Sequence, residues 1–316
     1  MSGMMMVFRK ELADHFTSWR FIILFFVVLL AGVFAIYVAA QNIRGTVTET
    51  TQFVFLGLFT TSGEALPSFL TFIVFFTPIV GVALGFDAIN SEKNSGTLSR
   101  LLSQPIFRDA VINGKFLAGI VTIAVMLVSI VMLVAGLGLR MIGVPPSSEE
   151  VIRLMAFLAI GIVYGGFWLG LAILFSLLFQ RVATSALASI AIWIFFIFFM
   201  YMLAGVIANI LAPVDQSSTS EELLKNAGIQ LAAMRVSPIM LFNEAMIVLL
   251  VPGARTMGQI FQLQTSASTA WMLPTPLSLG QSLLSVWPHL VSLIALTVVC
   301  FAISYIKFMR EEIRST

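Results

Sequence analysis

Long apolar runs alternate with polar segments along this chain, and each run approaches the roughly 20 residues that a helix needs to cross a bilayer. The pattern predicts an all-α polytopic membrane protein, with residues 1–316 forming a single transmembrane domain. Six spans are expected, at about 21–40, 68–86, 117–139, 154–179, 186–211 and 286–305.

Composition supports this class independently. Hydrophobic residues make up 59% of the chain, charged residues make up 10%, and the mean hydropathy is +1.03. Soluble globular chains carry about 25% charged residues, so the composition excludes that class. The net charge of +2 is too small to indicate nucleic-acid binding, and the single cysteine, Cys300, excludes an intrachain disulfide.

The polar block at 87–116, between the second and third spans, holds seven charged residues, four of them Lys or Arg. A basic block between two spans is expected in the cytoplasm. Ser95 or Gly96 is suited to cap a short helix there, and Pro105 is suited to end it. One face of that helix would carry Leu98, Leu101 and Leu102. This face suits docking of a partner, although the leucines would equally pack on the protein's own surface.

The segment before the first span, residues 7–20, has the periodicity of an amphipathic helix. Its apolar positions recur at helical spacing: Phe8, Leu12, Phe16 and Trp19. Its polar side is expected to hold Arg9, Lys10, Glu11 and Asp14. We expect a helix in the membrane interface with Trp19 at headgroup depth. A simple charged lead-in to the first span is the alternative.

The remaining polar segments are expected outside the cell. They are 41–67, a short loop that contains Arg140, Glu149, Glu150 and Arg153, and a long loop at 212–285. Within the long loop, the apolar stretch 239–251 is too short to span, so it is predicted to be a re-entrant or interfacial helix. This topology places both termini in the cytoplasm, with 11 of the 17 Lys and Arg residues on the cytoplasmic side. The external six are Arg44, Arg140, Arg153, Lys225, Arg235 and Arg255.

Two spans contain residues suited to a translocation path. A proline in the middle of the second span, Pro78, is expected to kink it, and Phe76 precedes this kink. The fifth span is dense in aromatic residues, among them Phe196 and Phe199. A path for an apolar substrate would use these side chains, but a static kink and ordinary lipid or core packing would also account for them.

Several kinds of chemistry are missing from the sequence. Gly114 and Lys115 lack the upstream glycine of a phosphate-binding loop, because Asp109 stands there. No Asp, Glu, Lys or Arg lies near the middle of a predicted span, so an ion-coupled carrier is not indicated. The two histidines, His15 and His289, are expected near the interfaces, the latter hydrated, and they form no metal site with one cysteine. Energy for any transport must then come from another protein.

The run EKNSGTLSRLLSQPIFR at 92–108, followed by Gly114 and Lys115, resembles the first cytoplasmic loop of type-2 ATP-binding-cassette exporter permeases. The resemblance is greatest to the branch with permeases of copper-enzyme maturation and gliding-associated transporters. It implies six spans, an N-terminal elbow helix and a re-entrant element before the last span. It also implies a coupling helix that docks on a separate ATPase. The residues carried over to docking are Glu92, Gly96, Thr97, Leu98, Arg100, Leu101, Leu102, Pro105 and Arg108.

The resemblance further implies the partners and the location. The chain would need no cofactor of its own, since ATP and Mg would bind two copies of the ATPase subunit. A second copy or a related permease would complete a dimer in the plasma membrane, and the long external loop would offer a site for an external partner. Two alternatives stay open: a membrane anchor or sensor that recruits the ATPase without transport, and a lipid-modifying enzyme using Glu244 and His289.

Overall fold

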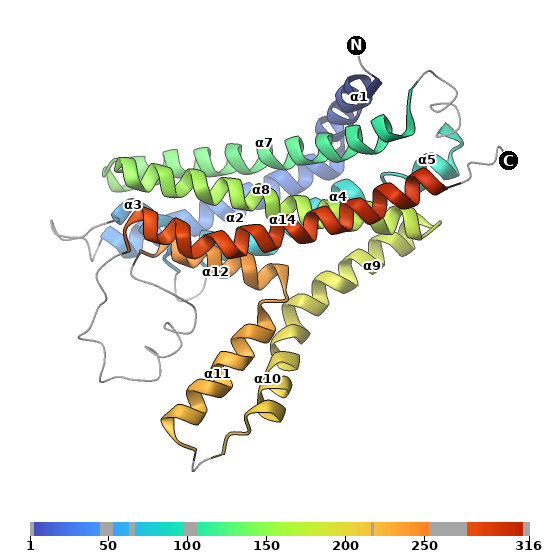
Figure 1. Ribbon diagram of the computed structural model, residues 1–316. Coiled ribbons are helices and arrows are strands. Elements are labelled where there is room, and N and C mark those ends of the chain that lie inside the picture. Colours follow the sequence, from blue (N-terminus) through green and yellow to red (C-terminus); the bar gives the residue numbers. More distant parts are fainter. Residues whose placement is uncertain are drawn as a thin grey trace. The chain divides into compact units, whose positions relative to one another are not determined.

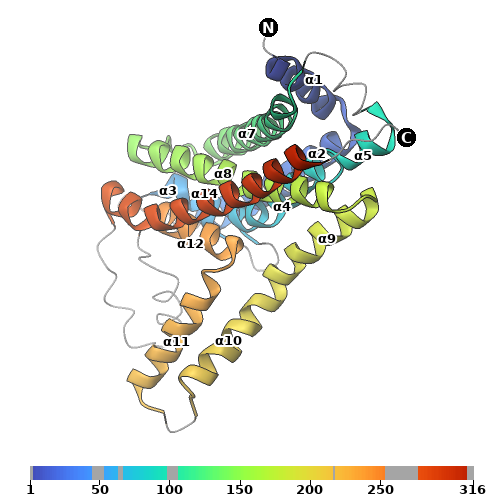
Figure 2. The same ribbon diagram turned by 45° about the vertical axis from the view of Figure 1, so that its right-hand side comes forward.

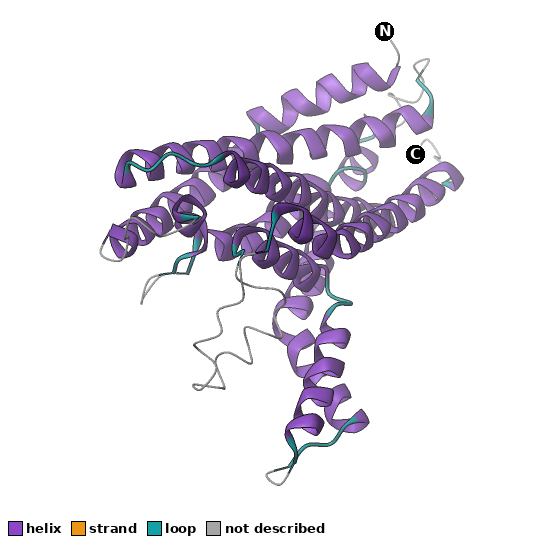
Figure 3. Cartoon of the chain, turned by 60° about the vertical axis from the view of Figure 1, so that its left-hand side comes forward, coloured by secondary structure: helices purple, strands orange, loops and turns teal. Residues whose placement is uncertain are grey.

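The computed structural model describes residues 3–44, 53–62, 67–97, 106–215, 218–252 and 277–311. Within these ranges the chain is helical and contains no strand (Figure 3). Six helical stretches are long and apolar enough to cross a membrane, as predicted. They are Trp19–Ile43, Phe69–Asn94, Arg108–Ile142, Ser148–Leu178, Val182–Leu211 and Leu279–Arg310.

The described residues separate into two compact units, 1–190 with 294–316 and 191–293. Figure 1 labels the elements. Unit 1 holds α1 (Gly3–Thr17), α2 (Trp19–Arg44), α3 (Val54–Thr60), α4 (Phe69–Gly85), α5 (Asn90–Asn94), α7 (Arg108–Ile142) and α8 (Ser148–Leu178). Unit 2 holds η1 (Phe195–Phe199), α10 (Met200–Leu211), α11 (Ser220–Met234) and α12 (Pro238–Leu250). Two helices belong to both units: α9 (Val182–Ile194) and α14 (Leu279–Arg310).

The core of unit 1 depends on close contact between α4 and α8. A Cβ atom at Gly81 would lie 2.9 Å from the carbonyl oxygen of Gly165, and one at Gly85 would lie 2.8 Å from Cβ of Ala172. Without a hydrophobic driving force inside a bilayer, helices associate through such close packing of small residues. The glycines therefore fix how near these two helices approach.

The loops that flank α7 and α8 are shorter than the sequence indicated. The predicted external loop included Arg140 and Arg153, but α7 ends at Ile142 and α8 begins at Ser148. A capping box formed by Ser147 and Glu150 starts α8, because each side chain satisfies a backbone N–H of the other. Arg153 is buried and paired with Glu149. Both helices therefore continue into the predicted external loop, since charged residues can occupy the first turns of a long helix when capped and paired, and the membrane boundaries of these spans stay a prediction.

The predicted external segment 41–67 also contains a short helix, α3. The buried Glu150 carboxylate accepts hydrogen bonds from the backbone N–H groups of Phe55 (3.0 Å) and Leu56 (3.2 Å). These are donors of the first turn of α3, which have no partner within the helix. A carboxylate from another helix thus anchors α3.

The fifth predicted span is not one regular helix. Five consecutive residues between α9 and α10 form a π-helix, η1, whose sequence is FFIFF. Such wide turns are rare and often occur at functional sites. The rings of Phe195 and Phe199 stack within this turn, with centroids 6.4 Å apart.

The long predicted loop at 212–285 contains two helices and the start of α14. The helix predicted at 239–251 is present as α12, whereas α11 was missed. A second capping box, from Thr219 and Glu222, begins α11, and Asn226 on α11 bonds Asn209 of α10, beside which α11 lies (Figure 2). The axes of α11 and α12 differ by 113°, the geometry of a broken span or a re-entrant loop.

Candidate functional site

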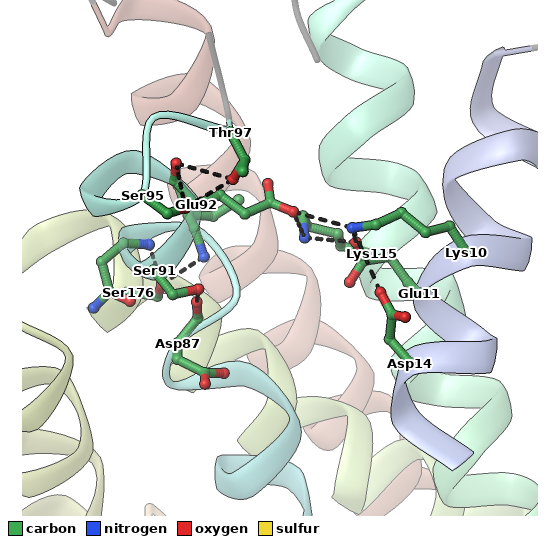
Figure 4. A network of polar contacts seen from close by, with 12 residues as sticks. Lys10, Glu11, Asp14, Asp87, Ser91, Glu92, Ser95, Thr97, Lys115 and Ser176 are labelled. Atoms are coloured by element: carbon green, nitrogen blue, oxygen red, sulfur yellow. Dashed lines mark hydrogen bonds and ion pairs between the residues drawn. The ribbon is translucent and has the colours of Figure 1, made fainter. Parts of the chain in front are cut away.

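Lys115 on α7 lies at the centre of a charged network at the base of the predicted coupling loop. Its side chain is only 5% exposed, and its Nζ lies 2.8 Å from Oε1 of Glu11 and 2.9 Å from Oε1 of Glu92. Lys10 approaches the same two carboxylates, at 3.0 and 3.4 Å. We call Lys10, Glu11, Glu92 and Lys115 the loop-root network (Figure 4). It joins α1, α5 and α7, which are far apart in the sequence.

The charges in this network neutralise one another. Burial by itself would raise the pKa of Glu11, but the nearby ammonium groups of Lys115 and Lys10 outweigh it and lower that pKa. Glu11 therefore stays ionised in a buried position. The sequence placed Glu11 on the polar side of the first helix but gave no sign that this carboxylate is buried, because its partner, Lys115, comes from α7.

Residues of α8 and the residue Gln180 after it hold the start of the predicted coupling loop. The hydroxyl of Ser176 accepts hydrogen bonds from the backbone N–H groups of Ile89 (2.8 Å) and Asn90 (3.1 Å). The Asn94 side chain donates to the carbonyl of Gln180 (3.1 Å), just beyond the end of α8. The short helix α5 is therefore fixed at both ends, and Glu92 points toward Lys115 from a defined backbone (Figure 4).

A tight turn follows α5. Gly96 has φ of +69°, a left-handed conformation that glycine adopts without steric cost. The hydroxyls of Ser95 and Thr97 each donate to the carbonyl of Glu92 at 3.3 Å. Gly96 and Thr97 thus form the turn from which the loop leaves. The docking residues Leu98, Arg100, Leu101, Leu102 and Pro105 lie outside the described residues.

The far end of the loop returns beside its start. Arg108, predicted within the loop, is the first residue of α7, and its Nη1 donates to the backbone carbonyl of Glu311 at 2.6 Å. The carboxylate of Glu311 pairs with Lys93 on α5. The segment after α14 therefore connects the two ends of the loop.

A cavity of about 230 Å³ opens beside the network. Its polar wall carries charges of both signs, including Lys10, Asp14, Arg20, Asp87 and Glu92. Its apolar wall includes Phe21, Leu24 and Val80. Arg20 and Asp87 pair across it at 2.5 Å. The balance of charges does not favour an anion or a cation.

The residues predicted for the elbow helix lie at the surface of unit 1. Phe8, Leu12 and Phe16 on α1 are half-buried, whereas Trp19, the first residue of α2, is 77% exposed. The face of α1 that packs on α7 carries Val7 and Glu11. The role of the predicted apolar face at a membrane surface stays a prediction.

The residues predicted for a translocation path belong to different units. Phe76 lines a small apolar cavity in unit 1, and Pro78 is buried in the same helix. Phe196 and Phe199 lie on η1 of unit 2, where Phe199 is 51% exposed. A path shared by these residues therefore stays a prediction.

Unit 2 holds a second charged cluster. The Glu244 carboxylate accepts two hydrogen bonds from Arg235, at 2.9 and 2.6 Å, and lies 2.9 Å from Nε2 of His289. Glu244 is 1% exposed and His289 is 8% exposed. The expectation that water satisfies His289 was wrong for Nε2, because α12 supplies a buried carboxylate to it, whereas its position near a membrane interface stays a prediction. The enzyme alternative named Glu244 and His289 together without any pattern that placed them in contact; the structure brings the two side chains together and adds Arg235.

Six helical stretches that can cross a bilayer, with charged clusters tying their ends together, define a multi-pass membrane protein. Residues 5–313 match the sequence profile of the ABC-2 family transporter proteins, so the chain belongs to this family.

Two curated relatives are similar to this chain. The probable ABC transporter permease protein NosY of Pseudomonas aeruginosa is 28% identical over 195 residues, which cover 60% of this chain and 65% of that protein. The protein of the same name from Stutzerimonas stutzeri is 31% identical over 144 residues, which cover 42% of this chain and 48% of that protein. The aligned regions span less than two thirds of either relative.

Proposed function

We propose that this chain is the membrane-spanning subunit of an ATP-driven exporter. The loop at 92–108 would dock on a separate nucleotide-binding subunit that holds ATP and Mg, present in two copies. A second copy of this chain, or a related permease, would complete the pathway, with Phe76, Pro78, Phe196 and Phe199 along it. Both termini and this loop would lie in the cytoplasm, at the plasma membrane.

The observation that supports this proposal best is the position of Lys115. It binds Glu92 at the start of the loop and Glu11 on α1 at the same time, at 2.9 and 2.8 Å. Because buried ion pairs resist separation, a force on the loop would reach α1 and α7 together. Such a connection suits a protein whose membrane helices must follow the movement of an ATPase outside the membrane.

Docking is tested by co-purification from membranes with Leu98→Asp and Leu101→Asp combined. Two carboxylates placed in an apolar groove should cost several kcal/mol, about the range that removes a micromolar complex. We expect an ATPase to co-purify with the wild type and to be lost from this variant. The matched control combines Leu223→Asp with Leu224→Asp, at two exposed positions of α11, and should retain the ATPase.

Two results would contradict docking: a folded wild type that brings down no ATPase, or a loop variant that retains it. A membrane anchor would give the same co-purification as a transporter. The two are separated by ATP-dependent movement of cargo in vesicles that contain both subunits, which only the transporter performs.

A further inference from the structure

Arg235 and His289, from separate parts of unit 2, both contact the carboxylate of Glu244. Arg235 stands at the bend between α11 and α12, Glu244 lies in the middle of α12, and His289 lies on α14. At about 1.5 Å per residue, His289 is roughly 15 Å along α14 from its first residue. Placing ionisable groups inside membrane helices costs free energy, and such groups commonly mark functional positions. We therefore expect this cluster to have a role beyond packing.

The contacts of the cluster are asymmetric. Both Glu244 oxygens are engaged, Oε1 by Arg235 and Oε2 by Arg235 and His289. The Arg235 side chain is 41% exposed while that of Glu244 is 1% exposed. Among the described residues, no other charged side chain pairs with any of the three. The buried carboxylate therefore depends on one exposed arginine for its neutralisation and on one histidine for a further polar contact.

Two buried polar atoms near these residues have no hydrogen-bond partner within the part of the chain that the structure describes. They are Nδ1 of His289 and Oγ of Ser237, which follows Arg235 by two residues. Buried polar groups are almost always hydrogen-bonded, and each exception lowers the stability of the arrangement that contains it. Exposing this region to water would satisfy both atoms. These two unsatisfied atoms therefore destabilise the buried arrangement relative to a hydrated one. The contacts of Glu244 stabilise the buried arrangement and so oppose opening.

We propose that Arg235, Glu244 and His289 form an electrostatic latch that holds the bent α11–α12 pair closed against the first part of α14. Glu244 is the latch's positioning residue, since both other members bind only through it. Breaking its ion pairs would let water reach the bend at Ser237. In a transporter this segment would be a gate, and that part of the inference rests on the proposed function.

The contact between Glu244 and His289 is less suited to catalysis than to a latch. Glu244 would orient His289 as a base, but within the described residues Nδ1 of His289 has no hydrogen-bond partner, so no nucleophile is in contact with it. The unpartnered Nδ1 of His289 argues against a catalytic role, but it agrees with a latch in which water reaches this atom when the latch opens.

The latch is tested by thiol labelling of the full chain in lipid nanodiscs, where both membrane faces are accessible. In a Cys300→Ser background, Ser237→Cys introduces a reporter at a position that is 2% exposed. A water-soluble maleimide should react slowly with this reporter when Glu244 is present. Glu244→Gln removes the charge at similar volume, and we expect the labelling rate to rise about ten-fold or more, as loss of a charge-assisted hydrogen bond predicts.

Matched controls separate local opening from unfolding. Glu221→Gln neutralises an exposed carboxylate on α11 and should leave the rate unchanged. A reporter at the buried position of Ser304→Cys, in unit 1, should stay protected in Glu244→Gln, and one at exposed Ser220→Cys should react rapidly in every variant. If Glu244→Gln fails to fold, Arg235→Gln gives the same test with the carboxylate retained.

Slow labelling at Ser237→Cys in both folded latch variants would overturn the proposal, as would equal acceleration by Glu221→Gln. Acceleration at Ser304→Cys as well would mean that the substitution unfolds the chain, and a latch would then be rejected in favour of a stabilising ion pair. The assay contains no ATPase, so its result is independent of whether the loop at 92–108 docks on one.

Discussion

Lys115 shows how one buried charge can unite distant segments. Its ammonium group is nearly inaccessible, and the two carboxylates that neutralise it come from α1 and α5. A buried ion pair contributes little net stability compared with apolar packing, but removing one member leaves a charge without compensation. The main effect of the loop-root network is therefore to determine that α1, α5 and α7 meet. Its contribution to overall stability is smaller.

We predict that Lys115→Met lowers the free energy of unfolding by about 3–5 kcal/mol, because Glu11 and Glu92 then keep only the half-exposed Lys10 as a cation partner in the loop-root network. Lys10→Met should cost less than about 1 kcal/mol, since the Lys10 side chain is 51% exposed and water screens its ion pairs. Unfolding titrations with a denaturing detergent measure both. Adding Glu11→Gln to Lys115→Met should recover part of the loss, and equal costs for the two lysines would refute this account.

At the scale of elements, the contact between α4 and α8 in unit 1 depends on glycine rather than on charge. The backbone of α8 approaches α4 where Gly81 and Gly85 leave room for it. The glycine pattern of α8 was visible in the sequence, but the particular glycines in contact depend on how the two helices are rotated.

Gly85→Ala should destabilise the protein by about 1–3 kcal/mol, the range for overpacking a tight core. Its Cβ would lie 2.8 Å from Cβ of Ala172 and 2.9 Å from the carbonyl oxygen of Leu169. The control is Gly136→Ala on α7, where no described atom outside the backbone of this helix lies within 4 Å of the new Cβ. That change should be neutral or stabilising by up to about 1 kcal/mol, from helix propensity. Thermal unfolding in nanodiscs compares the two, and the reverse order would contradict the packing argument.

At the scale of the whole molecule, the charge distribution predicts orientation in the membrane. The segments assigned to the cytoplasm hold most of the Lys and Arg residues, and the loop at 92–108 is among them. Two of these basic residues, Lys10 on α1 and Lys115 on α7, meet in the loop-root network at the start of that loop.

We predict that a membrane-impermeant maleimide applied to intact cells labels Ser220→Cys but not Ser95→Cys, both in the Cys300→Ser background. Both positions are exposed, so the side of the membrane on which each cysteine lies decides whether the maleimide reacts with it. Permeabilised cells should label both equally, which serves as the control. Labelling of Ser95→Cys alone in intact cells would show the opposite orientation.

The sequence by itself determined the class of protein, the six spans and the helix α12. The reason is that hydropathy and length are local properties, and these two properties decide whether a segment can cross a bilayer. Two starts of helices were also present in the sequence as capping boxes, SSEE at 147–150 and TSEE at 219–222, although their significance was missed. Recognising them would have placed the first turn of α8 and all of α11 correctly.

Only the tertiary structure decided which charges meet. Glu11 and Lys115 are 104 residues apart, and Glu244 and His289 are 45 apart. Helical periodicity tells which side of one helix is polar, but it carries no information about which other helix that side will face. Both charged clusters therefore became visible only when the helices were packed, since the energy of an ion pair depends on distance in space and not on position in the chain.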